Sequence, residues 1–198
     1  MMNELKAIAE INEEIKSIVH AAESISLTAT NAILVARRAV NNAVGFNVVA
    51  RELRIFSEKM ALTMQGLSEL IYRQVSLSAS KRHRMRKIAL LVKASSIGGL
   101  PQQKIVMSYT QSLVDVSELE RLLKSLLREL QMTIRHTGKL CATGIVIARS
   151  ASIEAAHGGA MSLTLRQIAE GVESVIENKA RMWSVSSIGF RNCKWVPG

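Results

Sequence analysis

The sequence predicts an all-α protein, a long antiparallel four-helix coiled-coil bundle made of two helical hairpins in one chain. Apolar residues recur at alternating steps of three and four along most of the 198 residues, which is the period of a helix face that packs on other helices. Aromatic residues make up only 4% of the chain and there are only two prolines, a composition that favours thin cores between close-packed helices over a sheet. Glycine-containing breaks divide the pattern into four segments.

The first two helices are expected over residues 3–41 and 45–94. The apolar stripe of the first helix has helical spacing without the alternation of a strand, and it comprises Ile8, Ile11, Ile15, Ile18, Ala22, Ile25, Ala29, Ala32, Ala36 and Ala39. The stripe of the second comprises Phe46, Val49, Leu53, Phe56, Met60, Thr63, Leu67 and Leu70. Asn41-Asn42 before Gly45 indicates a tight reversal between the two helices.

The third and fourth helices are expected over residues 103–156 and 160–183. A loop over 95–101 precedes the third helix, since glycine ends a helix and Pro101 cannot continue one. The third stripe comprises Val106, Tyr109, Leu113, Val116, Glu120, Leu123, Leu127, Leu130, Ile134, Thr137, Cys141, Gly144, Ala148, Ala151 and Ala155, and the fourth comprises Leu165, Ile168, Val172 and Val175. His157-Gly158-Gly159 indicates a second reversal. The expected organisation is therefore a single bundle over 1–183, with hairpin one at 3–94, hairpin two at 103–183 and an irregular tail at 184–198.

One segment is similar to a known signalling motif. Residues 31–54, from Asn31 through Phe46 to Arg54, follow the pattern NAAIEAARAGE-x-GRGF-x-VVA-x-EVR without a gap and agree with it at 12 of the 21 specified positions. This segment resembles the hairpin tip in the cytoplasmic signalling domain of methyl-accepting chemotaxis proteins, the bacterial chemoreceptors. A second segment, residues 151–172, agrees at eight of the same positions.

The two segments lie 119 residues apart, which is 17 heptads. Their core stripes therefore stay in register: Ala32 falls on Ala151, Phe46 on Leu165 and Val49 on Ile168. We interpret the pair as a duplicated hairpin, so that one chain supplies the two hairpins that two chains supply in chemoreceptors, with both turns at one end.

The resemblance implies a scaffold that contacts a chemotaxis histidine kinase or its coupling adaptor through the hairpin tip. The candidate partner-binding residues at matching positions are Val35, Arg38, Asn41, Phe46, Glu52, Glu154 and His157. Several depart from the family: Val35 and Asn41 replace tip glutamates, and His157 replaces an arginine. A structural helical adaptor that no longer contacts the kinase is therefore the alternative function. Either could be a monomeric bundle or a homo-oligomer.

The charge of the chain is unevenly placed. The formal net charge is +10, and no acidic residue occurs between Glu69 and Asp115. A basic patch is expected at Lys81, Arg82, Arg84, Arg86 and Lys87. Such a patch binds nucleic acid, an acidic protein or a lipid surface, but no stacking aromatic lies beside it. We favour a solvated helix face, which leaves a basic nucleic-acid-associated bundle as a third and weaker reading.

No catalytic or metal-binding pattern is present in the sequence. The four histidines have no ligand spacing, and Cys141 lies on a core position, so neither an enzyme nor a cofactor is expected. Glu120 and Lys179 are polar residues on the stripes and are expected to pair or to fix register. The most apolar stretch between charges, residues 140–148, is far shorter than the ~20 residues of a membrane span. With two cysteines, a cytoplasmic location is expected, as a soluble relative or a fragment of a receptor.

Overall fold

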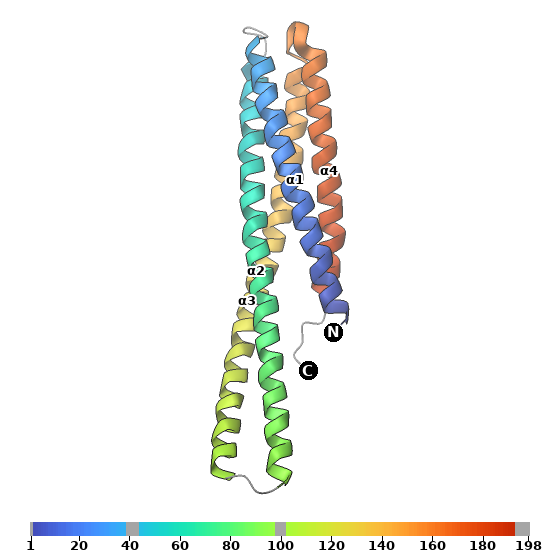
Figure 1. The fold of residues 1–198 in the computed structure, drawn as a ribbon. Coiled ribbons are helices and arrows are strands. Elements are labelled where there is room, and N and C mark those ends of the chain that lie inside the picture. The colour runs from blue at the N-terminus through green and yellow to red at the C-terminus, as the bar shows by residue number, and fades with distance from the viewer. Residues whose placement is uncertain (1, 39–43, 98–101, 193–198) are drawn as a thin grey trace. The chain divides into compact units, whose positions relative to one another are not determined.

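The computed structural model describes residues 2–38, 44–97 and 102–192. They form four α-helices, α1 (Met2–Arg38), α2 (Val44–Ile97), α3 (Gln102–Ala155) and α4 (Ser162–Asn192), with a short 3-10 helix, η1 (Gly159–Met161), before α4 (Figure 1). Within these residues there is no strand. The predicted all-α class is therefore confirmed, and the helices pack as a helical bundle.

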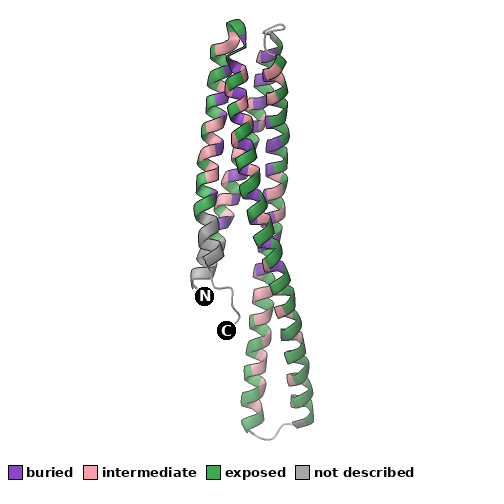
Figure 2. Cartoon of the chain, turned by 180° about the vertical axis from the view of Figure 1, so that it is seen from behind, coloured by how far each residue is buried: buried purple, intermediate pink, exposed green. Residues whose placement is uncertain are grey.

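The chain divides into two compact units. The first unit comprises residues 1–68 and 132–195, and so contains α1, the first part of α2, the last part of α3, and α4. The second unit comprises residues 69–131, with 196–198, and contains the remainder of α2 and α3. Figure 2 shows buried positions on all four helices of the first unit.

Two predicted helix ends are wrong. α2 continues through Ser95 and Ser96 to Ile97, and both serine hydroxyls donate to carbonyl oxygens of the preceding turn at 2.7 Å, a local bond that a helix accommodates. α4 continues to Asn192, because no proline interrupts residues 184–192 and the single glycine there only weakens a helix. The reversal at 157–159 is confirmed, whereas the one at Asn41-Asn42 lies outside the described residues.

The core of the first unit follows the predicted stripes closely. In α1, every stripe residue from Ile11 to Ala36 is buried. The side chains of Ile8 and Ala39 are not among those that the structure describes. In α2 the buried row includes Phe46, Leu53, Phe56, Met60 and Leu67, and neighbouring Ala50 and Met64 are more deeply buried than Val49 and Thr63. In α3 the row from Leu130 to Ala155 is buried as predicted, and in α4 Leu165, Ala169, Val172, Ile176 and Trp183 are buried.

Contacts within the first unit give the direction of its helices. The ring of Phe56 lies against Gly144, and the carboxylate of Glu154 lies against Gly45. Residue numbers therefore decrease along α3 in the direction in which they increase along α2. α3 and α4 are joined by Trp183, whose Nε1 donates to the Ile134 carbonyl oxygen at 3.4 Å. α1 packs on α4. The Lys179 ammonium there donates to Ser17 Oγ at 2.5 Å.

The predicted stripe of α3 in the second unit is only partly the observed one, since Val116 is buried as predicted but two other positions are exposed. Val106 and Leu113 were expected in the core but are 60% and 43% exposed, whereas Ser112 and Leu126 are buried. Ser112 tolerates burial because its hydroxyl donates to the Ser108 carbonyl oxygen at 2.7 Å. The predicted core assignment of Val106 and Leu113 is therefore wrong.

The segment Ala9–Arg37 of α1 is long and apolar enough to cross a membrane, judged by length and composition, because its most apolar 18-residue window has a mean hydropathy of 1.3. No such segment was expected from the sequence, because charged residues such as Lys16 and Glu23 interrupt it. The isoleucines and alanines of its stripe are buried in the first unit, as they are in core helices of helical bundles.

Candidate protein-binding end of the first unit

A tight turn joins α3 to η1 and α4. The N–H groups of Ala156, His157 and Gly158 each donate to the carbonyl oxygen three residues earlier, at 3.1 Å. Gly159 has a φ of 56°, a left-handed conformation that glycine adopts without steric cost. A methyl group at Gly158 would lie 2.6 Å from Cδ1 of Leu165. The backbone conformation therefore favours glycine at 159, and a side chain at 158 would displace the Leu165 methyl group.

The end of α3 meets the beginning of α2 through Glu154 and Gly45. Any side chain at Gly45 would overlap the Glu154 carboxylate, whose Oε1 would lie 3.1 Å from such a Cβ. Gly45 is in the first turn of α2, where the helix dipole favours a negative charge. The carboxylate of Glu154, which matches a tip glutamate of the chemoreceptor pattern, therefore lies against the first turn of α2.

The predicted partner-binding residues have different environments. Phe46 is 1% exposed, so it is a core residue and not a contact surface. Glu52 and His157 are exposed, and Val35 and Glu154 are half-buried. Arg38 is in the last turn of α1, and its side chain is not among those described. Asn41 lies outside the described residues.

Burial repeats with the same 119-residue offset that relates the two tip segments. Core residues of α1 and α2 correspond to core residues of α3 and α4: Ala29 to Ala148, Ala32 to Ala151, Ala36 to Ala155, Phe46 to Leu165, Ala50 to Ala169 and Leu53 to Val172, all buried. The half-buried Val49 likewise corresponds to the half-buried Ile168. The internal correspondence thus extends to the burial of these positions.

Three pairs of exposed apolar residues also follow the offset. Leu34 (51% exposed) corresponds to Ile153 (65%), and Val44 (66%) corresponds to Leu163 (70%). A third pair, Leu27 and Val146, is also exposed. Sequence reasoning did not single out these residues. The available signal was an apolar residue at a position where the heptad predicts a polar one, repeated after seven residues in both α1 and α3.

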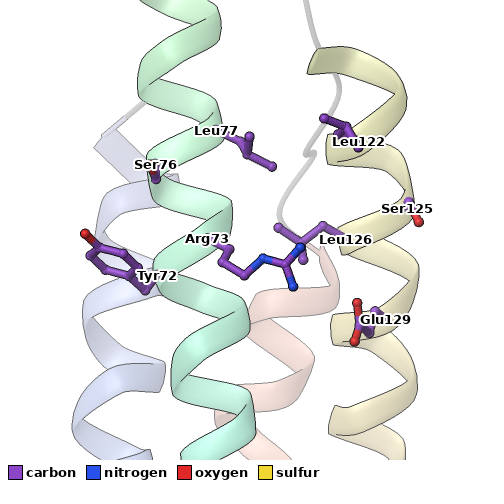
Figure 3. A pocket seen from close by; sticks show the side chains of 8 residues that line it. All are labelled: Tyr72, Arg73, Ser76, Leu77, Leu122, Ser125, Leu126 and Glu129. Atoms are coloured by element: carbon purple, nitrogen blue, oxygen red, sulfur yellow. The ribbon is translucent and has the colours of Figure 1, made fainter. Parts of the chain in front are cut away.

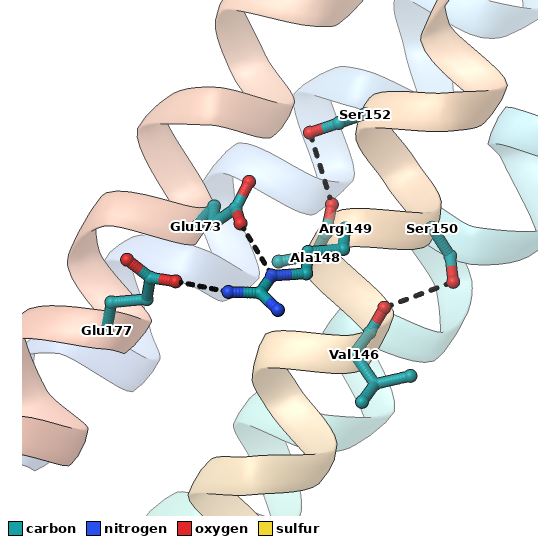
Figure 4. A network of polar contacts seen from close by, with 7 residues as sticks. All are labelled: Val146, Ala148, Arg149, Ser150, Ser152, Glu173 and Glu177. Carbon is teal, nitrogen blue, oxygen red and sulfur yellow. Dashed lines mark hydrogen bonds and ion pairs between the residues drawn. The ribbon is translucent and has the colours of Figure 1, made fainter.

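The two segments related by the 119-residue offset differ in their polar contacts. On the α3–α4 side, Arg149 donates from Nε to Glu173 at 3.0 Å and from Nη2 to Glu177 at 2.9 Å (Figure 4). These two carboxylates raise the pKa of the Arg149 guanidinium. The position 119 residues before Arg149 is Thr30, which instead donates to the Ser26 carbonyl oxygen. The contact of one guanidinium with two carboxylates is therefore not repeated at Thr30.

The predicted basic patch, in the second unit, is divided by the fold. Lys81 and Arg84 face α3, where Lys81 pairs with Glu120 at 2.9 Å and Arg84 with Asp115 at 3.1 Å. The hydrogen bond from Lys81, together with its charge, lowers the pKa of Glu120. Arg82 and Arg86 are exposed and Lys87 is half-buried. Of the two polar stripe residues, Glu120 therefore pairs across the helices, and Lys179 contacts Ser17.

The described residues enclose two kinds of hollow, a surface groove and a small internal void. A groove of about 270 Å³ in the second unit is open to solvent (Figure 3), and its lining consists of Tyr72, Arg73, Ser76, Leu77, Leu122, Ser125, Leu126 and Glu129. A void of about 20 Å³ in the first unit is lined by residues of all four helices, Cys141 among them. Burial raises the pKa of the Cys141 thiol to about 11, so the reactive thiolate is scarce at neutral pH.

Within the described part of the chain, no three His, Cys, Asp or Glu side chains gather closely enough to hold a metal ion. Neither a scan of protein-family models nor a search of curated proteins finds a match for the sequence.

Proposed function

We propose that this chain is a chemoreceptor-like scaffold that acts in the cytoplasm by binding a protein at the end of the first unit. The proposed arrangement is an antiparallel four-helix coiled coil of two duplicated hairpins, with both turns at the end where Glu154 meets Gly45. A chemotaxis histidine kinase or its coupling adaptor is the first partner to test.

The observation that carries this proposal is the matched pairs of exposed apolar residues. Leu34 with Ile153, and Val44 with Leu163, lie within about three turns of the reversals on all four helices. Apolar side chains that cluster on an exposed surface mark sites of protein interaction. Because the two members of each pair occupy equivalent positions of the proposed repeat, the end would present the same apolar surface twice.

Binding of the purified chain to a chemotaxis kinase and to its adaptor, measured by titration calorimetry, tests the proposal. The double variant Leu34→Ser/Ile153→Ser should weaken binding at least about tenfold if each side chain becomes buried in the complex. Leu62→Ser is the matched control, since Leu62 is 68% exposed but lies farther along α2. Equal affinity of the two variants for the partner would disprove a contact at this end.

A structural adaptor without kinase contact is the second candidate, and one observation favours it. Val35 and Asn41 replace tip glutamates, and the carboxylate of Glu154 lies against Gly45. The described tip therefore offers a partner few free carboxylates. Absence of binding to both the kinase and the adaptor in the same titrations would support this candidate over the first.

A further inference from the structure

The second unit has a strongly basic region next to the connection between α2 and α3. From Lys81 to Lys104 the sequence contains seven Lys and Arg residues and no acidic one. Two of the seven, Lys81 and Arg84, pair with Glu120 and Asp115 of α3. Arg86, Lys93 and Lys104 are exposed. The surface of this hairpin end therefore carries a positive charge that its own acids do not balance.

Exposed apolar side chains occupy one face of the same hairpin end. On α2 the inward Arg84 and half-buried Leu91 are each followed by an exposed apolar residue, Met85 (45% exposed) and Val92 (52%). On α3 the half-buried Ile105 and buried Ser112 are followed in the same way by Val106 (60%) and Leu113 (43%). On each helix, the residue that follows a contact position is rotated from it by about 100° around the helix axis.

These four apolar residues, which we call the apolar face, share one side of the helix pair. Two antiparallel helices that face each other are related by a two-fold axis perpendicular to the pair, so the same rotation brings both to the same side. The pairs Lys81–Glu120 and Arg84–Asp115 fix the register. They place Met85 near the level of Leu113, and Val92 near the level of Val106.

Basic residues border the apolar face. Arg86 and Lys93 each follow a residue of the face by one position and are exposed, so they lie along its α2 edge. Leu90, by contrast, precedes the contact residue Leu91 and projects to the other side, although it is 66% exposed. The arrangement is an apolar surface with a positive edge, which is the pattern of segments that lie in a membrane interface.

We propose that this face of the second unit binds the surface of an anionic lipid bilayer. Such a bilayer supplies both negative charge and a hydrocarbon layer for Met85, Val92, Val106 and Leu113. A second copy of the chain would bring its own acid-free basic segment against the first, and like charges repel. Nucleic acid would satisfy the basic residues but would leave the four apolar side chains in water. The anionic lipid surface is the partner that matches both the apolar face and the basic residues at its edge.

Vesicle flotation of the full chain tests the proposal. The chain should float with vesicles of phosphatidylcholine containing about 30% phosphatidylserine and remain unbound with phosphatidylcholine alone. Binding should weaken as salt is raised from low to moderate concentration, because ions screen the surface charge. Equal binding to neutral and anionic vesicles would overturn the proposal, and so would absence of binding to both.

Two matched pairs of variants locate the contact. Each basic residue near an anionic surface strengthens binding about fivefold, so Arg86→Gln/Lys93→Gln should lower the partition coefficient roughly 25-fold. Arg51→Gln/Lys59→Gln removes two exposed charges from the first unit and should leave it nearly unchanged. Val92→Ser should lower it about three- to fivefold, whereas Leu90→Ser, two residues away, should not. Circular dichroism of each variant verifies that helix content is retained.

Other occupants would give recognisable results. Dimerisation at micromolar concentration that Val92→Ser abolishes would assign the face to a second copy, and duplex DNA binding that exceeds vesicle binding would assign the basic residues to nucleic acid. Either result would overturn the lipid proposal. Val92→Trp and Leu90→Trp provide an independent measurement above the emission of the two native tryptophans. Anionic vesicles should shift the emission of Val92→Trp further to the blue than that of the wild type, and should not do so for Leu90→Trp. Equal shifts at the two positions would contradict the assigned face.

Discussion

Gly144 is a position at which a methyl group should destabilise the protein even though alanine is the better helix former. A Cβ there would lie 2.7 Å from Cε2 and 3.0 Å from Cε1 of the Phe56 ring. Forcing one extra carbon into a packed core costs about 1–3 kcal/mol, while replacing a mid-helix glycine by alanine gains up to ~1 kcal/mol. The free energy of unfolding of the Gly144→Ala variant should therefore be up to about 2 kcal/mol lower than that of the wild type.

Gly138 is the matched control, because it lies in the same helix, six residues earlier, and a methyl group there would meet no neighbouring side chain or other helix within 4 Å. Gly138→Ala should raise the free energy of unfolding by about 0.5–1 kcal/mol through reduced backbone entropy alone. Urea denaturation followed by circular dichroism gives both values, and unchanged slopes would verify that only stability differs.

A second substitution attributes the loss to the ring. Phe56→Leu in the Gly144→Ala background should relieve the overlap, so the double variant should be more stable than the sum of the two single changes predicts. A coupling of at least about 1 kcal/mol is expected for groups in direct contact. If Gly144→Ala stabilises the chain as much as Gly138→Ala does, then Phe56 does not lie against Gly144, and the pairing of α2 with α3 must differ.

Three further outcomes are expected. Phe46→Ala should lower the free energy of unfolding by about 3–5 kcal/mol, measured by thermal or urea denaturation, because a fully buried ring leaves a cavity; an unchanged melt would place the ring outside the core. Lys81 lowers the pKa of Glu120. The contribution of this pair to the free energy of unfolding is therefore complete above the ordinary carboxyl pKa, and it is lost as the pH falls through the lowered pKa of the folded state. That contribution is at most about 1 kcal/mol because the pair is partly exposed, and stability curves of Glu120→Gln should show less loss in acid than the wild type. Cys141, with a pKa of about 11, should react with a thiol reagent in a Cys193→Ser background only as fast as the chain opens; immediate reaction in native buffer would show an accessible thiol.

The core of α1 was predictable because its isoleucines and alanines occupy one face and polar residues occupy most of the others. Every stripe residue with a described side chain is buried. The start of α3 was not predictable in the same way, because Ile105-Val106 and Leu126-Leu127 place apolar residues at adjacent positions and the heptad fits either one. In the structure Leu126 is buried, whereas Val106 is 60% exposed and its neighbour Ile105 is half-buried.

The proposed protein-binding end was predictable in outline and not in its surface. The sequence pattern located the reversal at 157–159 and the alanine-rich core, and the resemblance singled out Glu154. It did not indicate that Glu154 lies against Gly45, since that contact joins residues more than a hundred positions apart. The exposed residues Leu34 and Ile153 were overlooked because they depart from the chemoreceptor pattern or match it without standing out. Apolar periodicity identifies the buried face of a helix, whereas a binding surface lies at the exposed positions, which do not follow that periodicity.

The duplication that we propose also accounts for how the two copies differ in the core. Phe56 and Gly144 meet between α2 and α3, and the equivalent positions in the other copy, 119 residues away in each case, are Val175 and Ile25. Phenylalanine with glycine and valine with isoleucine both contain seven side-chain carbons, so the two pairs divide a similar side-chain volume differently between their helices, although Val175 is only half-buried. Cores tolerate such exchanges when total volume is kept. In a bundle of two identical chains, any exchange of this kind would occur in both halves at once, whereas a single chain can change one half and leave the other. Covalent linkage therefore allows the two halves to keep a common core volume while their surfaces and polar contacts, such as the Arg149 pair with Glu173 and Glu177, diverge independently.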